Sequence, residues 1–144
     1  MNSSISDIKD HPVVSHDEGC FACSFWADTF NGSSVHLNPR DTTFVAISRA
    51  PLDKIEPFKQ KMGWSFKWLS SGASDFNFDY QASFTPEQIK SGEQFYNYIV
   101  TDHGMQDREG ISVFCKDESG AVFHTYSCYC LLYTSPSPRD RQKS

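Results

Sequence analysis

The chain has 144 residues, enough for one domain with a single core, and 15% of them are aromatic. Its formal net charge of -5 argues against a surface that binds nucleic acid. No apolar run approaches the roughly 20 residues that span a bilayer, and the N-terminus, MNSSISDIKDHPVV, lacks the basic and apolar regions of a secretory signal. We therefore expect a cytoplasmic protein that does not enter membranes and whose thiols stay mostly reduced.

Residues 1–17 are polar, and we expect them to be poorly ordered. The first regular element is a helix that follows Cys20. Ala22, Phe25, Trp26 and Phe30 fall on one helical stripe, and we expect the sequence Asn31-Gly32 to end the helix.

The next stretch predicts a strand, a helix and a second strand. Thr42 to Ser48, TTFVAIS, is a continuous β-branched and apolar run, which indicates a strand buried on both faces. Leu52 to Met62 follows a helical period between Pro51 and Gly63, with Pro57 as a local conflict that kinks or loosens the helix. Ser65 to Ser70 predicts the second strand. Strands that alternate with helices favour a parallel sheet.

After a loop-rich stretch, the last element is a β-hairpin. ISVFCKD and AVFHTYS alternate around the short turn Glu118-Ser119-Gly120. The fold class is therefore α/β, with a mostly parallel sheet, a C-terminal β-hairpin and flanking helices.

The end of the chain has neither a helical nor a strand period. Cys130 to Asp140, CLLYTSPSPRD, resembles the translation of a sequencing adaptor. We therefore treat residues 130–144 as a non-native, disordered tail, and residues 18–129 as the domain.

The stretch EGCFACSFWADTFNG carries the chemistry, because Cys20 and Cys23 lie one turn apart at a helix start. Unsatisfied N–H groups and the helix dipole favour the thiolate there, so Cys20 would attack and Cys23 would resolve a mixed disulfide. Two other interpretations stay open. A zinc site needs two more ligands, and the remaining candidates are scattered: His16, Cys115, His124 and Cys128. Alternatively, the two cysteines are structural.

Four segments carry a resemblance to a known family: GCFACSFWADTFNG, FVAISRAPLDKIEPFKQKMGWSFKWLSS, SDFNFDY and ISVFCKDESGAVFHTYS. They resemble an uncharacterised bacterial thioredoxin-like family with a C-x-x-C-S-F-W-A-D signature and an A-x-S-R-A-P-L motif, over about residues 19–129. The wider order of elements is similar to the peroxiredoxin branch of the thioredoxin superfamily. The resemblance implies a thioredoxin fold and thiol–disulfide exchange. It also implies a strand before the helix and a helix after the hairpin, so we expect a truncated chain, incomplete at both ends and of poor stability.

Three further residues are candidates for a substrate groove around the cysteines, each with an alternative, and only the first of them rests on the resemblance. Ser112 occupies the position that thioredoxins give to a cis-proline, so it either hydrogen-bonds a thiolate or marks a lost groove. Arg49 follows the first strand, where it would hold an anion or a thiolate, or else be solvated. Trp26 lines a substrate groove or packs in the core.

Four other residues have mainly structural interpretations. Asp28 is either a solvent-facing helix residue or a proton acceptor for a cysteine. We interpret His124 as a structural histidine of the hairpin, Cys115 as a small core residue and Trp64 as a packing residue.

Three functions follow from these observations. The first is thiol–disulfide exchange with Cys20 as nucleophile and Cys23 as resolving thiol. It needs no cofactor and no metal, and its partner is another protein or a low-molecular-weight thiol. The second is a non-catalytic thioredoxin-like module that binds a protein through its groove or surface. The third is a zinc-binding domain.

Overall fold

The computed structural model describes residues 21–129, and it divides the chain into two compact units, residues 1–73 and 74–144. The expectations for residues 1–17, for Cys20 and for the tail lie outside the described residues. The elements of the first unit are α1 (Phe21–Leu37), the 3-10 helix η2 (Asn38–Arg40), β1 (Val45–Ser48), α2 (Leu52–Met62) and β2 (Lys67–Ser70). Those of the second unit are α3 (Phe76–Asp79), α4 (Pro86–Ser91), β3 (Gln94–Tyr96), β4 (Ile99–Thr101), β5 (Ile111–Lys116) and β6 (Val122–Cys128).

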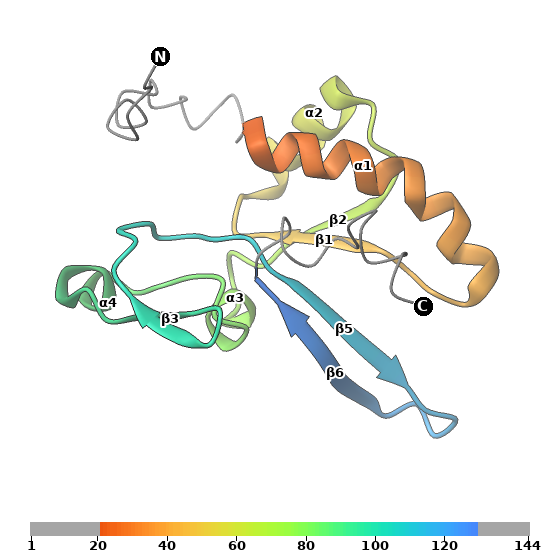
Figure 1. Ribbon diagram of the computed structural model, residues 1–144. Coiled ribbons are helices and arrows are strands. Elements are labelled where there is room, and N and C mark those ends of the chain that lie inside the picture. The colour runs from red at the N-terminus through yellow and green to blue at the C-terminus, as the bar shows by residue number, and fades with distance from the viewer. Residues whose placement is uncertain (1–20, 130–144) are drawn as a thin grey trace, which may run out of the picture. The chain divides into compact units, whose positions relative to one another are not determined.

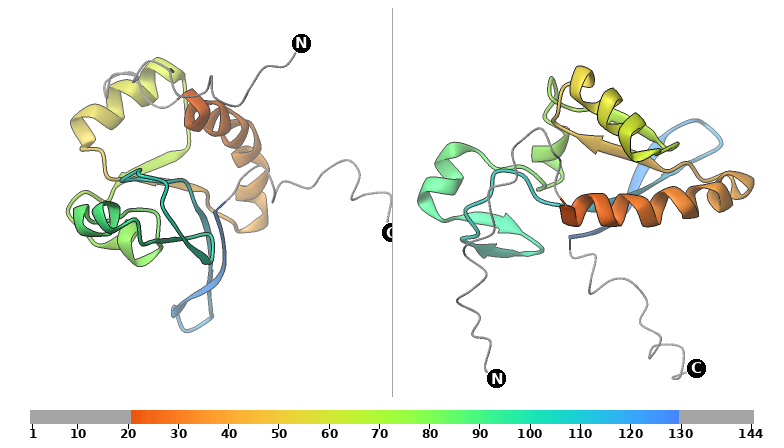
Figure 2. Two further views of the ribbon diagram at one scale, coloured as in Figure 1. Left: turned by 60° about the vertical axis from the view of Figure 1, so that its left-hand side comes forward. Right: turned by 90° about the horizontal axis from the view of Figure 1, so that it is seen from above.

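The first unit is built on a parallel pair of strands, β1 and β2, joined by the crossover helix α2. The predicted helix Leu52–Met62 is confirmed at both ends, and Gly63 ends it in a left-handed conformation, with φ of 69°. The helix continues through Pro57. Helices α1 and α2 lie on the same side of the strand pair (Figures 1 and 2).

An aromatic cluster fills the space between these helices and the strands. Phe44 packs against Phe30 of α1 at 5.1 Å between ring centroids, and against Phe66 at 5.4 Å. Trp64 stacks on Phe66 at 5.4 Å and meets Phe58 of α2 at 5.6 Å. Since aromatic pairs contribute about 0.5–1.5 kcal/mol each beyond burial, this cluster accounts for much of the stability of the unit. The packing expected for Trp64 is confirmed.

The opposite face of the strand pair is partly open. Ile47 is 38% exposed and Leu69, its partner in register, is 40% exposed. The prediction that the first strand is buried on both faces is therefore wrong, because both helices of the unit cover the same face.

The predicted end of α1 at Asn31-Gly32 is also wrong, because the helix runs six residues or so further, to Leu37. The Asn31 side chain does not turn back on its own backbone, as a helix-ending Asn would. Its Oδ1 accepts hydrogen bonds from the Ser65 N–H at 2.8 Å and from the Ser65 hydroxyl at 3.1 Å. One turn earlier, Asp28 Oδ1 accepts from the Trp64 indole N–H at 2.6 Å. We call these four residues the α1 clamp, because they tie the helix to the chain between α2 and β2.

The described residues of the second unit, 74–129, form two β-hairpins and two short helices. Helix α4 begins with a capping box in which the Thr85 hydroxyl accepts from the Gln88 N–H and the Gln88 side chain accepts from the Thr85 N–H. Strands β3 and β4 pair antiparallel around Asn97-Tyr98, both with positive φ. The sequence did not predict this hairpin, because its strands have only three residues each and its turn contains no glycine.

The predicted C-terminal hairpin is confirmed as β5 paired antiparallel with β6. Its turn lies away from α3 and α4 of its own unit (Figure 1). The register shifts between Val113 and Phe114, so Thr125 is an extra residue on β6. The Thr125 hydroxyl donates to the Val113 carbonyl at 3.0 Å and so holds the bulge.

Taken together, the described residues form a mixed α/β structure with three two-stranded pairings, one parallel and two antiparallel. The thioredoxin-like fold and the single, mostly parallel sheet stay predictions. Between residues 21 and 129, no helix has both the length and the apolar character that crossing a membrane would require.

The α1 clamp gives a first testable prediction. Asn31→Ala removes the acceptor of two hydrogen bonds, and we expect the free energy of unfolding to fall by about 1 kcal/mol after the gain in helix propensity is subtracted. Tryptophan fluorescence during urea unfolding measures this, since all three tryptophans, Trp26, Trp64 and Trp68, lie in the first unit.

Asn31→Asp is the matched control, because it keeps an oxygen acceptor at the same place. We expect it to stay within about 0.5 kcal/mol of the wild type. Equal stability of the alanine and aspartate variants would contradict the clamp.

The hairpin turn gives a second prediction. Asp117 Oδ1 accepts hydrogen bonds from the Ser119 hydroxyl and from the N–H groups of Ser119 and Ala121. The Ser119 hydroxyl and then the Ala121 N–H hold the pKa of Asp117 below its usual 3.8. The order of the turn is therefore complete above about pH 4, and is lost as pH falls through the lowered pKa.

A carboxyl-carbon NMR titration measures this pKa, and the Ala121 amide signal follows the turn. Asp117→Asn keeps the acceptor oxygen but cannot ionise, so the amide signal should lose its acid transition. Glu118→Gln is the control, and in this variant the acid transition of the Ala121 amide signal should remain. An Asp117 pKa of 4 or above would show that the turn hydrogen bonds do not form.

Candidate functional site

The candidate site begins at the first turn of α1. Cys23 lies in that turn and is exposed. Cys20 directly precedes the first helical residue, and its position lies outside the described residues. The first turn of α1 contains no acidic residue, so nothing in this turn opposes the stabilisation of a thiolate by the helix dipole and the unsatisfied N–H groups.

The clamp fixes the helix that presents this turn. Asp28 and Asn31 lie five and eight residues after Cys23, on the part of α1 that faces Trp64 and Ser65. The Asp28 carboxylate therefore anchors α1 through the Trp64 indole, which is itself buried. A role for Asp28 as proton acceptor for a cysteine gains no support from this contact.

Trp26 and Arg49 belong to the same unit as Cys23. Trp26 is half-buried on α1, so it both packs and leaves part of its ring accessible, and its ring meets Phe25 edge-on at 6.0 Å. Phe25 itself is 62% exposed, contrary to its expected place on the inner stripe of the helix.

Arg49 directly follows β1, at the carboxyl end of the parallel pair. There the Ser71 N–H donates to the Ser48 carbonyl at 2.8 Å, and a Cβ at Gly72 would lie 2.8 Å from the Arg49 carbonyl oxygen. Helix α1 and strand β1, which are joined through η2, run in opposite directions, so the first turn of α1 and the carboxyl end of β1 lie at the same end of the unit (Figures 1 and 2). Cys23 and Arg49 therefore share that end.

Ser112 lies in the second unit, where its hydroxyl has a partner. Its Oγ lies 2.8 Å from the Ser127 Oγ, and the Ser127 Oγ lies 2.8 Å from Nε2 of His124. The same Nε2 lies 3.0 Å from the Tyr126 carbonyl oxygen. The expected structural role of His124 is thus supported by its contacts.

The contacts of His124 fit one tautomer of its ring. The Tyr126 carbonyl can only accept a hydrogen bond, so this contact fits a proton on Nε2, which then points towards both Tyr126 and Ser127. The chain from His124 through Ser127 to Ser112 stabilises the hairpin.

Cys115 was expected in a core, and the structure exposes it instead. It lies on the same face of the hairpin as Val113. In the register, Cys115 is opposite Phe123, and Val113 is opposite Tyr126. Val113, Phe123 and Tyr126 are themselves about half exposed. This face of the β5–β6 pair is apolar and accessible.

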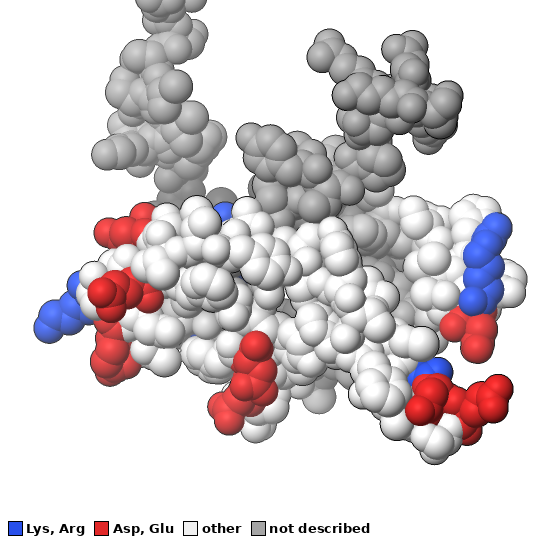
Figure 3. All heavy atoms as spheres, turned by 60° about the horizontal axis from the view of Figure 1, so that its bottom comes forward, with Lys and Arg blue, Asp and Glu red and all other residues white. Residues whose placement is uncertain are grey.

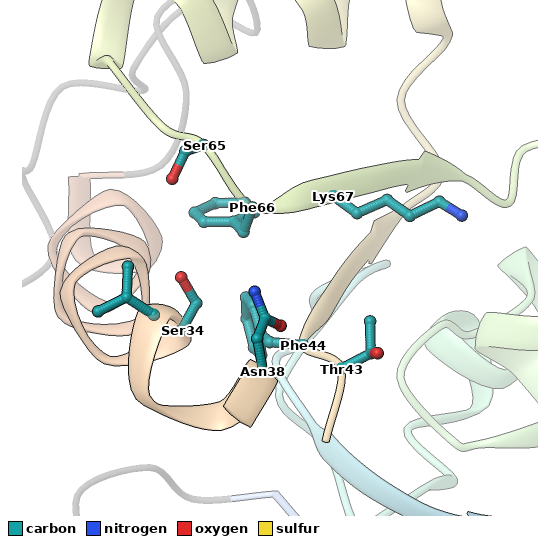
Figure 4. Close-up of a pocket in the computed structure, with 8 residues that line it drawn as sticks. Ser34, Asn38, Thr43, Phe44, Ser65, Phe66 and Lys67 are labelled. Carbon is teal, nitrogen blue, oxygen red and sulfur yellow. The ribbon is translucent and has the colours of Figure 1, made fainter. Parts of the chain in front are cut away.

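A pocket of about 250 Å³ lies in the first unit, between the C-terminal end of α1 and the starts of β1 and β2 (Figure 4). Phe44 and Phe66 form its apolar wall, and the hydroxyls of Ser34 and Ser65 both donate to Asn31. Val35 of this pocket is 12 residues beyond Cys23, which is about 18 Å along a helix. The pocket is therefore separate from the cysteine end of the unit.

The face in Figure 3 carries acidic side chains at several separate places, with few basic ones among them. This distribution agrees with the net charge of -5. Among residues 21–129, no three His, Cys, Asp or Glu side chains gather in a way that would hold a metal ion.

Sequence reasoning missed two groups of residues that position these features. One is the α1 clamp, and the other is a buried polar group around Gln94 and His103 in the second unit. In the sequence, each group is marked only by one polar residue, Asn31 or Gln94, within a segment that has no recognisable motif. Their partners lie up to 34 residues away.

Comparison with known proteins gives a family. No curated protein and no solved structure matches the chain. A family model described as "Bacterial protein of unknown function (DUF899)" matches residues 11–139, a span that includes Cys20, Cys23 and His103. The chain therefore belongs to this bacterial family of unknown function.

Proposed function

We propose that this chain is a thioredoxin-like domain that carries out thiol–disulfide exchange through Cys20 and Cys23. The observation that carries the proposal is the exposed Cys23 in the first turn of α1, a 17-residue helix held in place by the clamp. The parallel β1–β2 pair with its crossover helix and the β5–β6 hairpin also support a thioredoxin-like fold.

The proposed reaction has two steps. The Cys20 thiolate attacks one sulfur of a substrate disulfide, which forms a mixed disulfide and releases the other sulfur as a thiolate. The Cys23 thiolate then attacks the Cys20 sulfur, which forms the Cys20–Cys23 disulfide and releases the second substrate thiolate. The substrate gains two electrons and the cysteine pair loses two. A protein or a low-molecular-weight thiol restores the pair by the reverse exchange.

Arg49 and Trp26 are the proposed groove residues. Arg49 lies at the same end of the unit as Cys23, so its positive charge favours an anionic substrate or a thiolate there. The accessible part of the Trp26 ring offers an apolar contact. Ser112 is a weaker candidate, because its hydroxyl already bonds Ser127.

The experiment is a trapping assay with oxidised glutathione as the disulfide, followed by mass spectrometry. In Cys23→Ser, Cys20 should keep a bound glutathione, whereas the wild type should resolve it into an internal disulfide. The alkylation rate of Cys20 against pH should give a pKa near 7 or below, lower than the usual 8.5 or so of a cysteine.

Cys115→Ala is the matched control, because Cys115 is exposed but lies in the hairpin. The variant should form the internal disulfide as the wild type does. An unshifted thiol pKa together with no internal disulfide would reject the exchange reaction.

The apolar face of β5–β6 favours a second function, a non-catalytic module that binds another protein. Val113, Phe123 and Tyr126 supply an accessible apolar surface on that face, and such surfaces commonly mark interaction sites. Inert cysteines in the trapping assay would favour this module. Stoichiometric zinc after purification would instead favour a zinc-binding domain, for which the described residues assemble no ligand set.

A further inference from the structure

His103 of the second unit packs its ring between two aromatic side chains. The ring centroid lies 4.9 Å from that of Phe84 and 5.5 Å from that of Tyr96, edge-on in both cases. Its Nε2 is buried and has no hydrogen-bond partner among the described residues. Phe84 and Tyr96 are both buried and form the core of this unit together with Tyr129, and the partly buried His103 ring packs against them.

The other ring nitrogen fixes the protonation state of His103. Nδ1 lies 3.3 Å from the Met105 N–H and accepts a hydrogen bond from it. An accepting Nδ1 carries no proton, so the proton of the neutral ring is on the buried Nε2. The Met105 contact is therefore made by the neutral form of His103 and is lost when Nδ1 is protonated.

The segment that contains His103 is attached to β3 through Gln94, whose side chain is fully buried at 0% exposure. Gln94 Nε2 donates to the Met105 carbonyl at 2.8 Å, and Gln94 Oε1 accepts from the Gly104 N–H at 3.1 Å. Further along, the Phe84 N–H donates to the Gln106 carbonyl at 2.9 Å. The Arg108 N–H donates to the Ala82 carbonyl at 2.8 Å, and the Ser83 hydroxyl donates to Asp107 Oδ1. Residues 103–109 are therefore docked at both ends, and the attachment to Gln94 is the one that lies next to His103.

Charged groups around the ring oppose a second positive charge. The Arg108 guanidinium lies 4.5 Å above the centre of the Tyr96 ring. Burial of the ring and then Arg108 lower the pKa of His103 below its usual 6.5, while Asp102 and Glu109 partly oppose this shift. The Glu109 carboxylate also pairs with Arg108 at 3.5 Å. This pairing reduces the effect of the Arg108 charge on His103.

We propose that residues 103–109 form a pH-operated latch, which protonation of His103 releases from Gln94 and from the aromatic pair Phe84 and Tyr96. The proposal is independent of the thiol chemistry of the first unit.

Protonation acts through one hydrogen bond and one charge. A proton on Nδ1 turns the acceptor into a donor that faces the Met105 N–H, so that bond is lost. The new cation also lies in the aromatic cluster that Arg108 already contacts. Once Met105 and Gly104 move, Gln94 loses both partners, and a buried carboxamide without partners is costly until water reaches it.

The direction of the pH dependence follows from the lowered pKa. The released state binds more protons than the docked state between the two pKa values. The latch is therefore fully docked above about pH 6.5, and docking is lost as pH falls through the lower pKa of docked His103.

Amide hydrogen exchange of the intact chain tests the latch, together with an NMR titration of the histidine rings. We expect the protection factors of Gly104 and Arg108, corrected for the intrinsic effect of pH, to fall by up to tenfold per pH unit within this window. The His103 ring should titrate below 6.5. A ring pKa of 6.5 or above, or protection that does not change between pH 7 and 5, would overturn the proposal.

His103→Phe keeps an aromatic ring but cannot be protonated, and its protection factors should not vary over this pH range. His36→Gln is the control, because His36 is exposed at the end of α1 in the first unit; the pH dependence should be retained. If His103→Phe does not fold, the wild-type titration and exchange data still decide the outcome.

Discussion

Two polar side chains on one helix hold the first unit together. Asp28 and Asn31 of α1 accept hydrogen bonds from Trp64 and Ser65, which lie where the chain leaves α2 and enters β2. Strands β1 and β2 have only four residues each and bury little surface on their own. A two-stranded parallel pair therefore needs a helix packed on it to be stable. The clamp and the aromatic cluster beneath it supply that packing. The direction of α1, and hence the place of its first turn with Cys23, follows from these contacts.

In the second unit, a buried side-chain amide attaches a loop to a strand. Gln94 has no exposure, and both its polar atoms bond to the backbone of Gly104 and Met105. A buried amide of this kind contributes modestly when its partners are present and is costly when they leave. His103 lies beside those partners, so its protonation state bears on whether the amide keeps them. The two units therefore use polar anchors differently, one as a fixed attachment and one as an attachment that a proton can disturb.

The sequence predicted elements whose signals are local. Helix α2 was placed at both ends because Pro51 and Gly63 lie at its boundaries, and β5–β6 because two alternating runs flank a glycine turn. The length of α1 could not be predicted, since the partner of Asn31 is 34 residues away.

The candidate site was predictable to the same extent. The spacing of Cys20 and Cys23 was enough to place Cys23 in the first turn of a helix. Ser112 was expected either to hydrogen-bond a thiolate or to mark a lost groove, and its partner Ser127 on the neighbouring strand was not predicted. Cross-strand contacts of this kind depend on register, which the bulge at Val113 shifts. Hydrogen bonds that join distant segments were therefore the part that sequence reasoning could not supply.

We propose that Cys20 and Cys23 form a reversible redox pair at the start of α1. An equilibrium titration of the intact chain in glutathione buffers, with the disulfides mapped by mass spectrometry, tests this. We expect a single two-electron transition of the Cys20–Cys23 disulfide, with a potential within the range of about -270 to -120 mV that known dithiol exchange proteins cover. A chain that shows no Cys20–Cys23 disulfide at any ratio of oxidised to reduced glutathione would contradict the claim.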